Sequence, residues 1–360
     1  MSSELERRLE AAFAEAPEPD PGAGEEALHR ALRALQPAAP ARRGLRTAVL
    51  AFAAIVVLLV IAAGSLAAAG ALHISIGAKP KPHGGATQLA LPKGANGVAA
   101  IVDGRLSVVT RDGLGFQGRP VNAAALSPRA LYIAAGLGNS IVALAQNGRT
   151  AWSHPAGGKV VSIAWAPDGF RIAYVVDTGR HFVLHVIYGN GIHDTTIDRS
   201  VRPVRPSWRA DSLALAYVGG GGRAIVYDLG HLSHQLVGTT APVTRLAFAP
   251  VGRKLVVATP DAIVIGRKRL ATGQIEALGW LGGLPAAAVP GLNHAIVRSF
   301  GSHGQRVDNF AVPGPVLGFS GGLVVVRTPT RILAGWGRAK TVNTLLPVRR
   351  SAAVEDVAIG

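Results

Sequence analysis

The stretch SIAWAPDGFRIAYVV, residues 162–176, joins two apolar runs through the tetrapeptide Ala-Pro-Asp-Gly. Pro and Gly shape tight turns, whereas the aliphatic and aromatic residues on either side favour strands. The stretch therefore predicts a β-hairpin with Pro167 and Gly169 in a type I turn and Trp165 as the apolar anchor of the first strand. What it means for the fold depends on whether it recurs.

The same pattern recurs along the chain. RPSWRADSLALAYV and TRLAFAPVGRKLVVA repeat the spacing of anchor, turn and second strand, AAALSPRALYIAA precedes them, and IEALGWLGGLPAAAV and VLGFSGGLVVV are weaker copies. Successive anchors lie 39, 43, 40, 32 and 39 residues apart. The six anchors are Leu126, Trp165, Trp208, Phe248, Trp280 and Phe319.

A period of about 40 residues, with room for four short strands per unit, is typical of β-propeller blades. Asn-Gly and Gly-Asn-Gly in the second half of two units supply the positive φ angles of hairpin turns. A shorter unit begins near Gly97, and AAVEDVAIG at the C-terminus reads as a strand that completes it. We expect an all-β propeller of seven blades over residues 97–360, with six blades as the alternative. Further units begin near Val121, Lys159, Val201, Ala241, Ile275 and Pro315.

The segments AWAPDGFRIAY, SWRADSLALAY and AFAPVGRKLVV resemble the Ser-Pro-Asp-Gly repeats of TolB-like, WD-repeat-like bacterial propellers, over about 260 residues. That family consists mostly of non-enzymatic binding platforms in the cell envelope, so the resemblance implies a protein- or ligand-binding scaffold. The chain departs from the repeat where Arg129 and Val251 replace Asp, and where the last two units lack the Pro.

Residues 47–72, TAVLAFAAIVVLLVIAAGSLAAAGAL, form a segment of 26 residues without a charge. About 20 apolar residues span a bilayer as a helix, and a cleaved signal peptide has a shorter apolar core nearer the N-terminus. This segment predicts a retained transmembrane helix. Cations cluster just before it, so the positive-inside rule places residues 1–46 in the cytoplasm and the propeller outside, beyond a Pro/Gly-rich linker at 73–96.

The cytoplasmic tail contains two amphipathic patterns. Leu5, Leu9 and Phe13 are spaced as on one helix face, and EEALHRALRAL repeats the pattern before QPAAPARR ends it. Two short helices of this kind need a partner. One alternative is therefore an anti-sigma-like signalling regulator whose tail holds a cytoplasmic protein. Capture of a specific protein by residues 1–46 would distinguish it from a tail that only sets topology.

The charge is concentrated outside the predicted membrane. The chain has a net charge of +16; the tail contributes seven Arg and eight acidic residues, leaving 30 cations and 13 anions beyond residue 46, a net +17. Such a domain is attracted to anionic lipid, wall polymer or an acidic protein. Arg outnumbers Lys, as in GC-rich genomes, so composition alone is the other explanation. Scattered cations and few aromatic residues disfavour nucleic acid.

Several local motifs suggest chemistry, and each has a simpler structural interpretation. Gly318–Gly322 matches the G-x-S-x-G nucleophile elbow around Ser320, yet a strand rather than a helix is expected after it. His181 with His185 and His231 with His234 lack a nearby carboxylate for a zinc site. With no Cys, thiolate metal sites and disulfides are excluded. Gly219–Gly222 reads as a hairpin loop rather than a phosphate loop.

Asp168 and Asp211 occupy turn positions where Asp is common for backbone reasons. The densest cationic points are Gly266–Leu270, GRKRL, and Arg349-Arg350. No acid, base and nucleophile set is apparent, so we expect no catalysis, no cofactor and no metal; an envelope hydrolase or lyase is the remote alternative. The sequence identifies no ligand-binding residue.

Overall fold

The computed structural model describes residues 91, 97–110, 113–239, 241–266, 268–301, 304–320, 323–336 and 342–359. Residues 1–46, 47–72 and, apart from Leu91, 73–96 lie outside the described part, so the tail helices, the span and the linker remain predictions. Among the residues that the structure describes, no helix is long and apolar enough to cross a bilayer.

The described part contains seven four-stranded antiparallel sheets, which confirms seven blades over six. Blade 1 has β28 (Val354–Ile359), β1 (Gly97–Val102), β2 (Arg105–Thr110) and β3 (Gly113–Pro120), from the centre outward. Blade 2 has β4 (Ala124–Leu126), β5 (Tyr132–Leu137), β6 (Ser140–Ala145) and β7 (Thr150–Pro155). Blade 3 has β8 (Lys159–Trp165), β9 (Arg171–Asp177), β10 (Phe182–Tyr188) and β11 (Thr195–Val201).

The remaining blades follow the same order from the centre outward. Blade 4 has β12 (Ser207–Trp208), β13 (Ala214–Val218), β14 (Ala224–Asp228) and β15 (Ser233–Leu236). Blade 5 has β16 (Arg245–Phe248), β17 (Leu255–Ala258), β18 (Ala262–Ile265) and β19 (Lys268–Ala271). Blade 6 has β20 (Ala277–Leu281), β21 (Leu284–Pro290), β22 (Ala295–Phe300) and β23 (Arg306–Val312). Blade 7 has β24 (Val316–Ser320), β25 (Leu323–Arg327), β26 (Arg331–Trp336) and β27 (Val342–Pro347).

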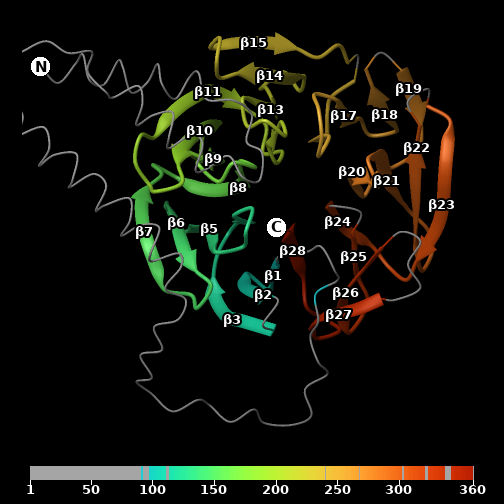
Figure 1. The fold of residues 1–360 in the computed structure, drawn as a ribbon, viewed down its shortest axis with the longest axis horizontal. Coiled ribbons are helices and arrows are strands. Elements are labelled where there is room, and N and C mark those ends of the chain that lie inside the picture. Colours follow the sequence, from blue (N-terminus) through green and yellow to red (C-terminus); the bar gives the residue numbers. More distant parts are fainter. Residues whose placement is uncertain are drawn as a thin grey trace, which may run out of the picture. The chain divides into compact units, whose positions relative to one another are not determined.

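The blades form a closed ring. Each innermost strand contacts the innermost strand of the next blade, from β4 through β8, β12, β16, β20 and β24 to β28, which contacts β4 again. Figure 1 shows the C-terminal strand β28, in red, beside the blue-green β1 of the first blade. The last strand of the chain therefore completes the first sheet, as the sequence predicts, and removes two open sheet edges.

The core consists of seven apolar clusters, one between each pair of neighbouring blades. Because both faces of a blade pack against neighbours, the second strands are buried along most of their length. Ala214–Val218, for example, is buried at every position. This explains why these strands read as continuous apolar runs instead of alternating patterns. The stability of each blade therefore depends on the blades on either side of it.

Strand register confirms the repeat. In blades 2 to 5 each anchor pairs with the residue seven positions later: Leu126 with Ile133, Trp165 with Ile172, Trp208 with Leu215 and Phe248 with Leu255. In blades 6 and 7 the pairs are Trp280 with Pro285 and Phe319 with Val324, five positions apart. The copies in blades 6 and 7 therefore have a turn shorter by two residues.

The anchor tryptophans tie blades together. The indole Nε1 of Trp208 donates to the carbonyl of Ala164 in the preceding blade at 3.0 Å, and Trp280 does the same to Ala247 at 3.1 Å. Trp165 instead donates to Gly169 O in its own turn at 2.9 Å, where Gly169 has φ +80° and its N–H donates to Ala166 O. The predicted turn is thus present, and the anchor also stabilises it.

Candidate functional site

The innermost strands of the seven blades surround a central channel of about 690 Å³. This volume lies within the range of small-molecule and peptide pockets. One end is formed by the starts of the innermost strands and carries charged residues. The other end lies at the turns that lead to the second strands and includes Pro167 and Pro250. The two ends therefore differ in chemistry.

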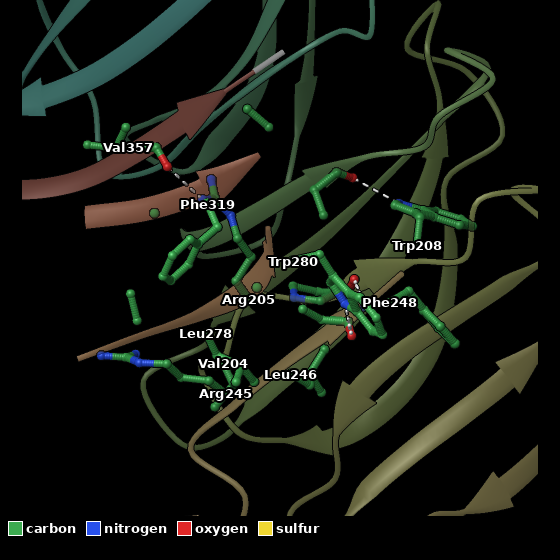
Figure 2. Close-up of a pocket in the computed structure, with 18 of the residues that line it drawn as sticks. Val204, Arg205, Trp208, Arg245, Leu246, Phe248, Leu278, Trp280, Phe319 and Val357 are labelled. Atoms are coloured by element: carbon green, nitrogen blue, oxygen red, sulfur yellow. Dashed lines mark hydrogen bonds between the residues drawn. The ribbon is translucent and has the colours of Figure 1, made fainter. Parts of the chain in front are cut away.

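Arg205, which lies just before β12, donates hydrogen bonds to the innermost strands of three other blades on one side of the channel. Its Nε donates to Ile163 O at 3.0 Å, one terminal nitrogen to Val357 O at 3.1 Å and the other to Ala124 O at 2.6 Å. Those carbonyls belong to the innermost strands of blades 3, 1 and 2. The rigid, forked guanidinium suits three such acceptors in different directions. Figure 2 shows Arg205 extending toward Val357.

Arg245, the first residue of β16, lines the same end of the channel. Burial among protein atoms lowers the pKa of its guanidinium, and the negative charge of Glu276 opposes that shift. Glu276 itself accepts a bond from Val316 N at 3.4 Å. In Figure 2, Arg245 points away from Arg205. Its side chain is exposed to the channel, where an anionic group can pair with the guanidinium.

Aromatic and aliphatic side chains form the adjoining wall of the channel. Trp208, Phe248, Trp280 and Phe319 come from the innermost strands of blades 4 to 7. Leu246 and Leu278 also line this wall, as Figure 2 shows. Trp208, Leu246, Phe248 and Trp280 are mostly buried between the blades, so the partly buried Leu278 and Phe319 are the apolar side chains of this wall that a ligand could contact.

The sequence analysis missed both channel arginines, although the repeat contains a signal for them. Arg205 and Arg245 each stand three residues before their anchors, Trp208 and Phe248. The other copies have Ala, Ser, Ala and Val at this position. Arginine occurs there only in two neighbouring blades, so comparison of the copies position by position would have selected these residues.

Two motifs considered for chemistry are hairpins. Ser320 is the last residue of β24, and the strand β25, not a helix, follows it, as the sequence predicts. Gly219–Gly222 connects β13 to β14, with Gly222 N donating to Gly219 O at 2.8 Å and Gly222 at φ +78°. It is the predicted hairpin loop.

Two of the four candidate histidines, His185 and His231, do have a carboxylate partner, contrary to the sequence analysis. His185 Nδ1 lies 3.1 Å from Asp194 Oδ2, and His154 Nε2 of blade 2 lies 3.6 Å from the same atom. Tyr174 donates to Asp194 Oδ1 at 2.8 Å and stacks on His185 with 5.0 Å between ring centroids. We call these four residues the Asp194 cluster. It joins blades 2 and 3.

The other histidines are at the surface or in a second cluster. His181 lies in the β9–β10 turn, where its N–H donates to Thr178 Oγ1. His231 contacts Asp228 at 3.1 Å, and His234 lies 3.4 Å from the hydroxyl of Tyr217, which donates to Asp198. In the described part of the chain no three His, Asp or Glu side chains are placed to hold a metal ion.

Asp168 and Asp211 are satisfied within their own turns. Asp168 accepts from Phe170 N at 2.8 Å and pairs with Arg171 at 3.3 Å. Asp211 accepts from Leu213 N at 2.9 Å and from Arg209 at 2.8 Å. The structural interpretation of both residues is therefore supported.

The cationic segments are spread over the domain. In GRKRL, Arg269 pairs with Asp261. Arg349 and Arg350 are exposed in the turn before β28. Neither segment lines the channel.

The fold and channel define a seven-bladed β-propeller with a ligand-sized central channel. Its backbone is similar to the structure of U3-55K, with a TM-score of 0.48 at 12% identity over 64% of this chain and 81% of that one. TolB from Acinetobacter baumannii gives 0.45 at 15% over 73% and 66%, and the Myceliophteria thermophila Cps50 (Swd1) propeller 0.47 at 12% over 67% and 90%. No protein-family model and no curated protein matches the sequence.

Replacing Arg205 should weaken the ring. Arg205→Ala leaves three partly buried carbonyls without this donor, so we expect the free energy of unfolding to fall by about 1–3 kcal/mol. Arg205→Lys, which lacks the fork, should recover only part of the loss. Urea unfolding measures this. Arg202→Ala is the control, since exposed Arg202 donates to the carbonyl of Gly220 at the surface. Equal losses for the two alanine variants would contradict the role assigned to Arg205.

The Asp194 cluster should make stability depend on pH. Burial raises the pKa of Asp194, but hydrogen bonds from His185 and Tyr174 and the charges of His185 and His154 outweigh it, and the net pKa is lowered. A lowered folded pKa contributes stability that is present above the unfolded value of about 4 and is lost as the pH falls through the folded pKa. Asp194→Asn should therefore destabilise the protein at pH 7 by about 1–3 kcal/mol.

The difference between Asp194→Asn and the wild type should shrink as the pH falls below about 4, because the wild-type carboxyl is then protonated. Denaturant unfolding at a series of pH values measures it. Tyr174→Phe keeps the ring and removes one bond to Asp194, so its loss should be smaller. A difference that stays constant from pH 7 to acid would show that the Asp194 charge does not stabilise the fold.

Proposed function

We propose that this chain is a single-pass membrane protein that presents the propeller outside the cytoplasm of a bacterium, as a non-enzymatic scaffold that binds another component of the cell envelope. The observation that carries the binding role is the channel, which has Arg245 at its charged end and apolar side chains along its wall. Membrane attachment is supported by the uncharged segment 47–72 and by the cations before it.

The channel favours an acidic protein segment as the ligand. Arg205 is bonded to three carbonyls, whereas Arg245 points elsewhere. Arg245 is exposed to the channel, so a carboxylate of the ligand could pair with its guanidinium, and apolar residues of the same segment would contact the partly buried Leu278 and Phe319. The net +17 beyond residue 46 attracts an acidic partner over a longer range.

A photo-reactive amino acid at Thr244, which lines the charged end of the channel, tests the binding role. In intact cells of the source bacterium we expect a discrete cross-linked product with an envelope protein, and we expect Arg245→Glu to abolish it by charge repulsion. The same photo-reactive residue at Leu292, an exposed turn position between β21 and β22, is the matched control. Products that are identical with and without Arg245→Glu would argue against the channel as the binding site.

The topology is tested by cysteine labelling, since the chain has no Cys of its own. On intact cells, a membrane-impermeant maleimide should label Leu292→Cys and should not label Ser2→Cys, which should react only after lysis. The reverse result would place the propeller in the cytoplasm and exclude an extracytoplasmic scaffold.

A further inference from the structure

One face of the propeller carries large apolar side chains at its turn tips. The turns between the first and second strands of blades 2 to 5 present Leu131, Phe170, Leu213 and Val251, which are 50%, 73%, 47% and 82% exposed. The first three follow the turn at equivalent positions of the repeat. Turn tips are usually polar, and these side chains are too exposed to contribute much to the core, so packing does not explain them.

These turns are neighbours in space. Asp168 N in the turn of blade 3 donates to Ser212 Oγ in that of blade 4 at 3.0 Å. A Cβ on Gly169 would lie 3.9 Å from Pro128 in blade 2. The innermost strands of blades 4 and 5 are also in contact. The apolar tips therefore form one continuous arc over four consecutive blades, which we call the apolar arc.

The turns between third and fourth strands lie on the same face and extend the arc. Gly189 N donates to Phe170 O at 2.7 Å, and Leu229 N donates to Leu213 O at 2.9 Å. These turns add the exposed side chains of Tyr188, Ile192 and Leu232. Including Tyr132 at the start of β5, eight of the twelve strongly exposed large apolar side chains in the described residues lie here. Apolar patches of this kind mark interaction sites.

Charge on this face is positive. The acidic side chains described on this face are paired: Asp168 with Arg171, Asp211 with Arg209, Asp194 with His185 and Asp228 with His231. Exposed cations lie in the same turns, namely Arg129, Arg149, Arg253 and Lys254. Apolar side chains between cations fit an anionic lipid surface, where the former enter the headgroup region and the latter meet phosphates.

β1 begins at this face. Val98 of β1 pairs with Ile359 at the end of the innermost strand β28. A Cβ on Gly97 would lie 2.9 Å from Ala130 Cβ, in the turn that carries Leu131. Leu91 already packs against the apolar cluster between blades 7 and 1, so residues 73–90, a tether of 18 residues that reaches at most about 60 Å, separate the propeller from the uncharged segment 47–72. A bilayer spanned by that segment is therefore held within reach of this face.

We propose that the apolar arc and its cations dock on the anionic outer surface of the membrane to which the chain is anchored. This inference rests on the proposed function for the membrane anchor, and it adds which face of the propeller is turned toward the membrane. The arc enters the headgroup region, and Arg129, Arg149, Arg253 and Lys254 contact lipid phosphates. The opposite face, with Arg245 at the end of the channel, then points away from the bilayer.

The full chain, reconstituted in nanodiscs, tests the proposal. Because the chain lacks Cys, Val251→Cys and Leu292→Cys can each be labelled at one site with the fluorophore NBD, which brightens in apolar surroundings. We expect a several-fold brighter signal at position 251 in nanodiscs containing phosphatidylglycerol than in pure phosphatidylcholine, and no change at 292 on the other face. The gain should decrease at 1 M salt, where the Debye length is about 3 Å.

Two sets of variants test separately the apolar side chains of the arc and the cations beside it. The triple change Leu131→Ser, Phe170→Ser and Leu213→Ser and the pair Arg129→Glu and Arg253→Glu should each abolish the gain at position 251. All five side chains are exposed, so the unfolding midpoint should stay at the wild-type value, which is measured in parallel. Loss of the gain at an unchanged midpoint supports docking; retention of the gain in both sets overturns it.

The outcomes distinguish this inference from the proposed function. A chain that enters nanodiscs while its label at 251 stays as dim as that at 292 overturns docking and leaves the anchor intact. A chain that fails to enter nanodiscs contradicts the anchor; brightening of position 251 on added phosphatidylglycerol vesicles would then still support the lipid-binding face, and no brightening would overturn it. If the label at position 251 brightens only after an envelope protein is added, the apolar arc binds that protein, and the docking on lipid is overturned.

Discussion

The pairing of β28 with β1 is the constraint on which the rest of the structure depends. Every blade buries its two faces against its neighbours, so an open ring would leave two faces and two edges exposed to water. β28 also forms the innermost strand of blade 1, and its carbonyl at Val357 is one of the three that Arg205 bonds. Closure of the ring therefore fixes the shape of the channel as well as the core.

Arg205 shows how a repeated fold acquires an asymmetric channel. Seven equivalent blades would produce a symmetric channel, but a guanidinium from blade 4 bonds the innermost strands of blades 1, 2 and 3. Arg245, at the same repeat position in blade 5, points elsewhere. One position of the repeat thus bonds the ring together in one blade and lines the open channel in the next.

Local sequence patterns predicted the fold, whereas the contacts of the candidate site could not be predicted from the sequence. Leu126, Trp165, Trp208 and Phe248 mark hairpins whose strands pair at the predicted register, because turn chemistry and apolar spacing act over fewer than ten residues. The three acceptors of Arg205 lie 42, 81 and 152 residues away, and His154 meets Asp194 across two blades. Such pairs exist only after the blades are placed, so spacing along the sequence does not indicate them.

The differences between the copies also give the ring two unlike faces. Blades 2 to 5 keep the longer turns, and these project the apolar arc. Blade 6 has a turn of two glycines, Gly282 and Gly283, both at positive φ, which shortens the tip and presents no side chain. The apolar arc therefore lies on one face of the ring, the face at which β1 begins, and covers only blades 2 to 5 of it. Docking through it would hold blades 2 to 5 against lipid and leave the end of the channel beside Arg245 open to a partner that approaches from the envelope.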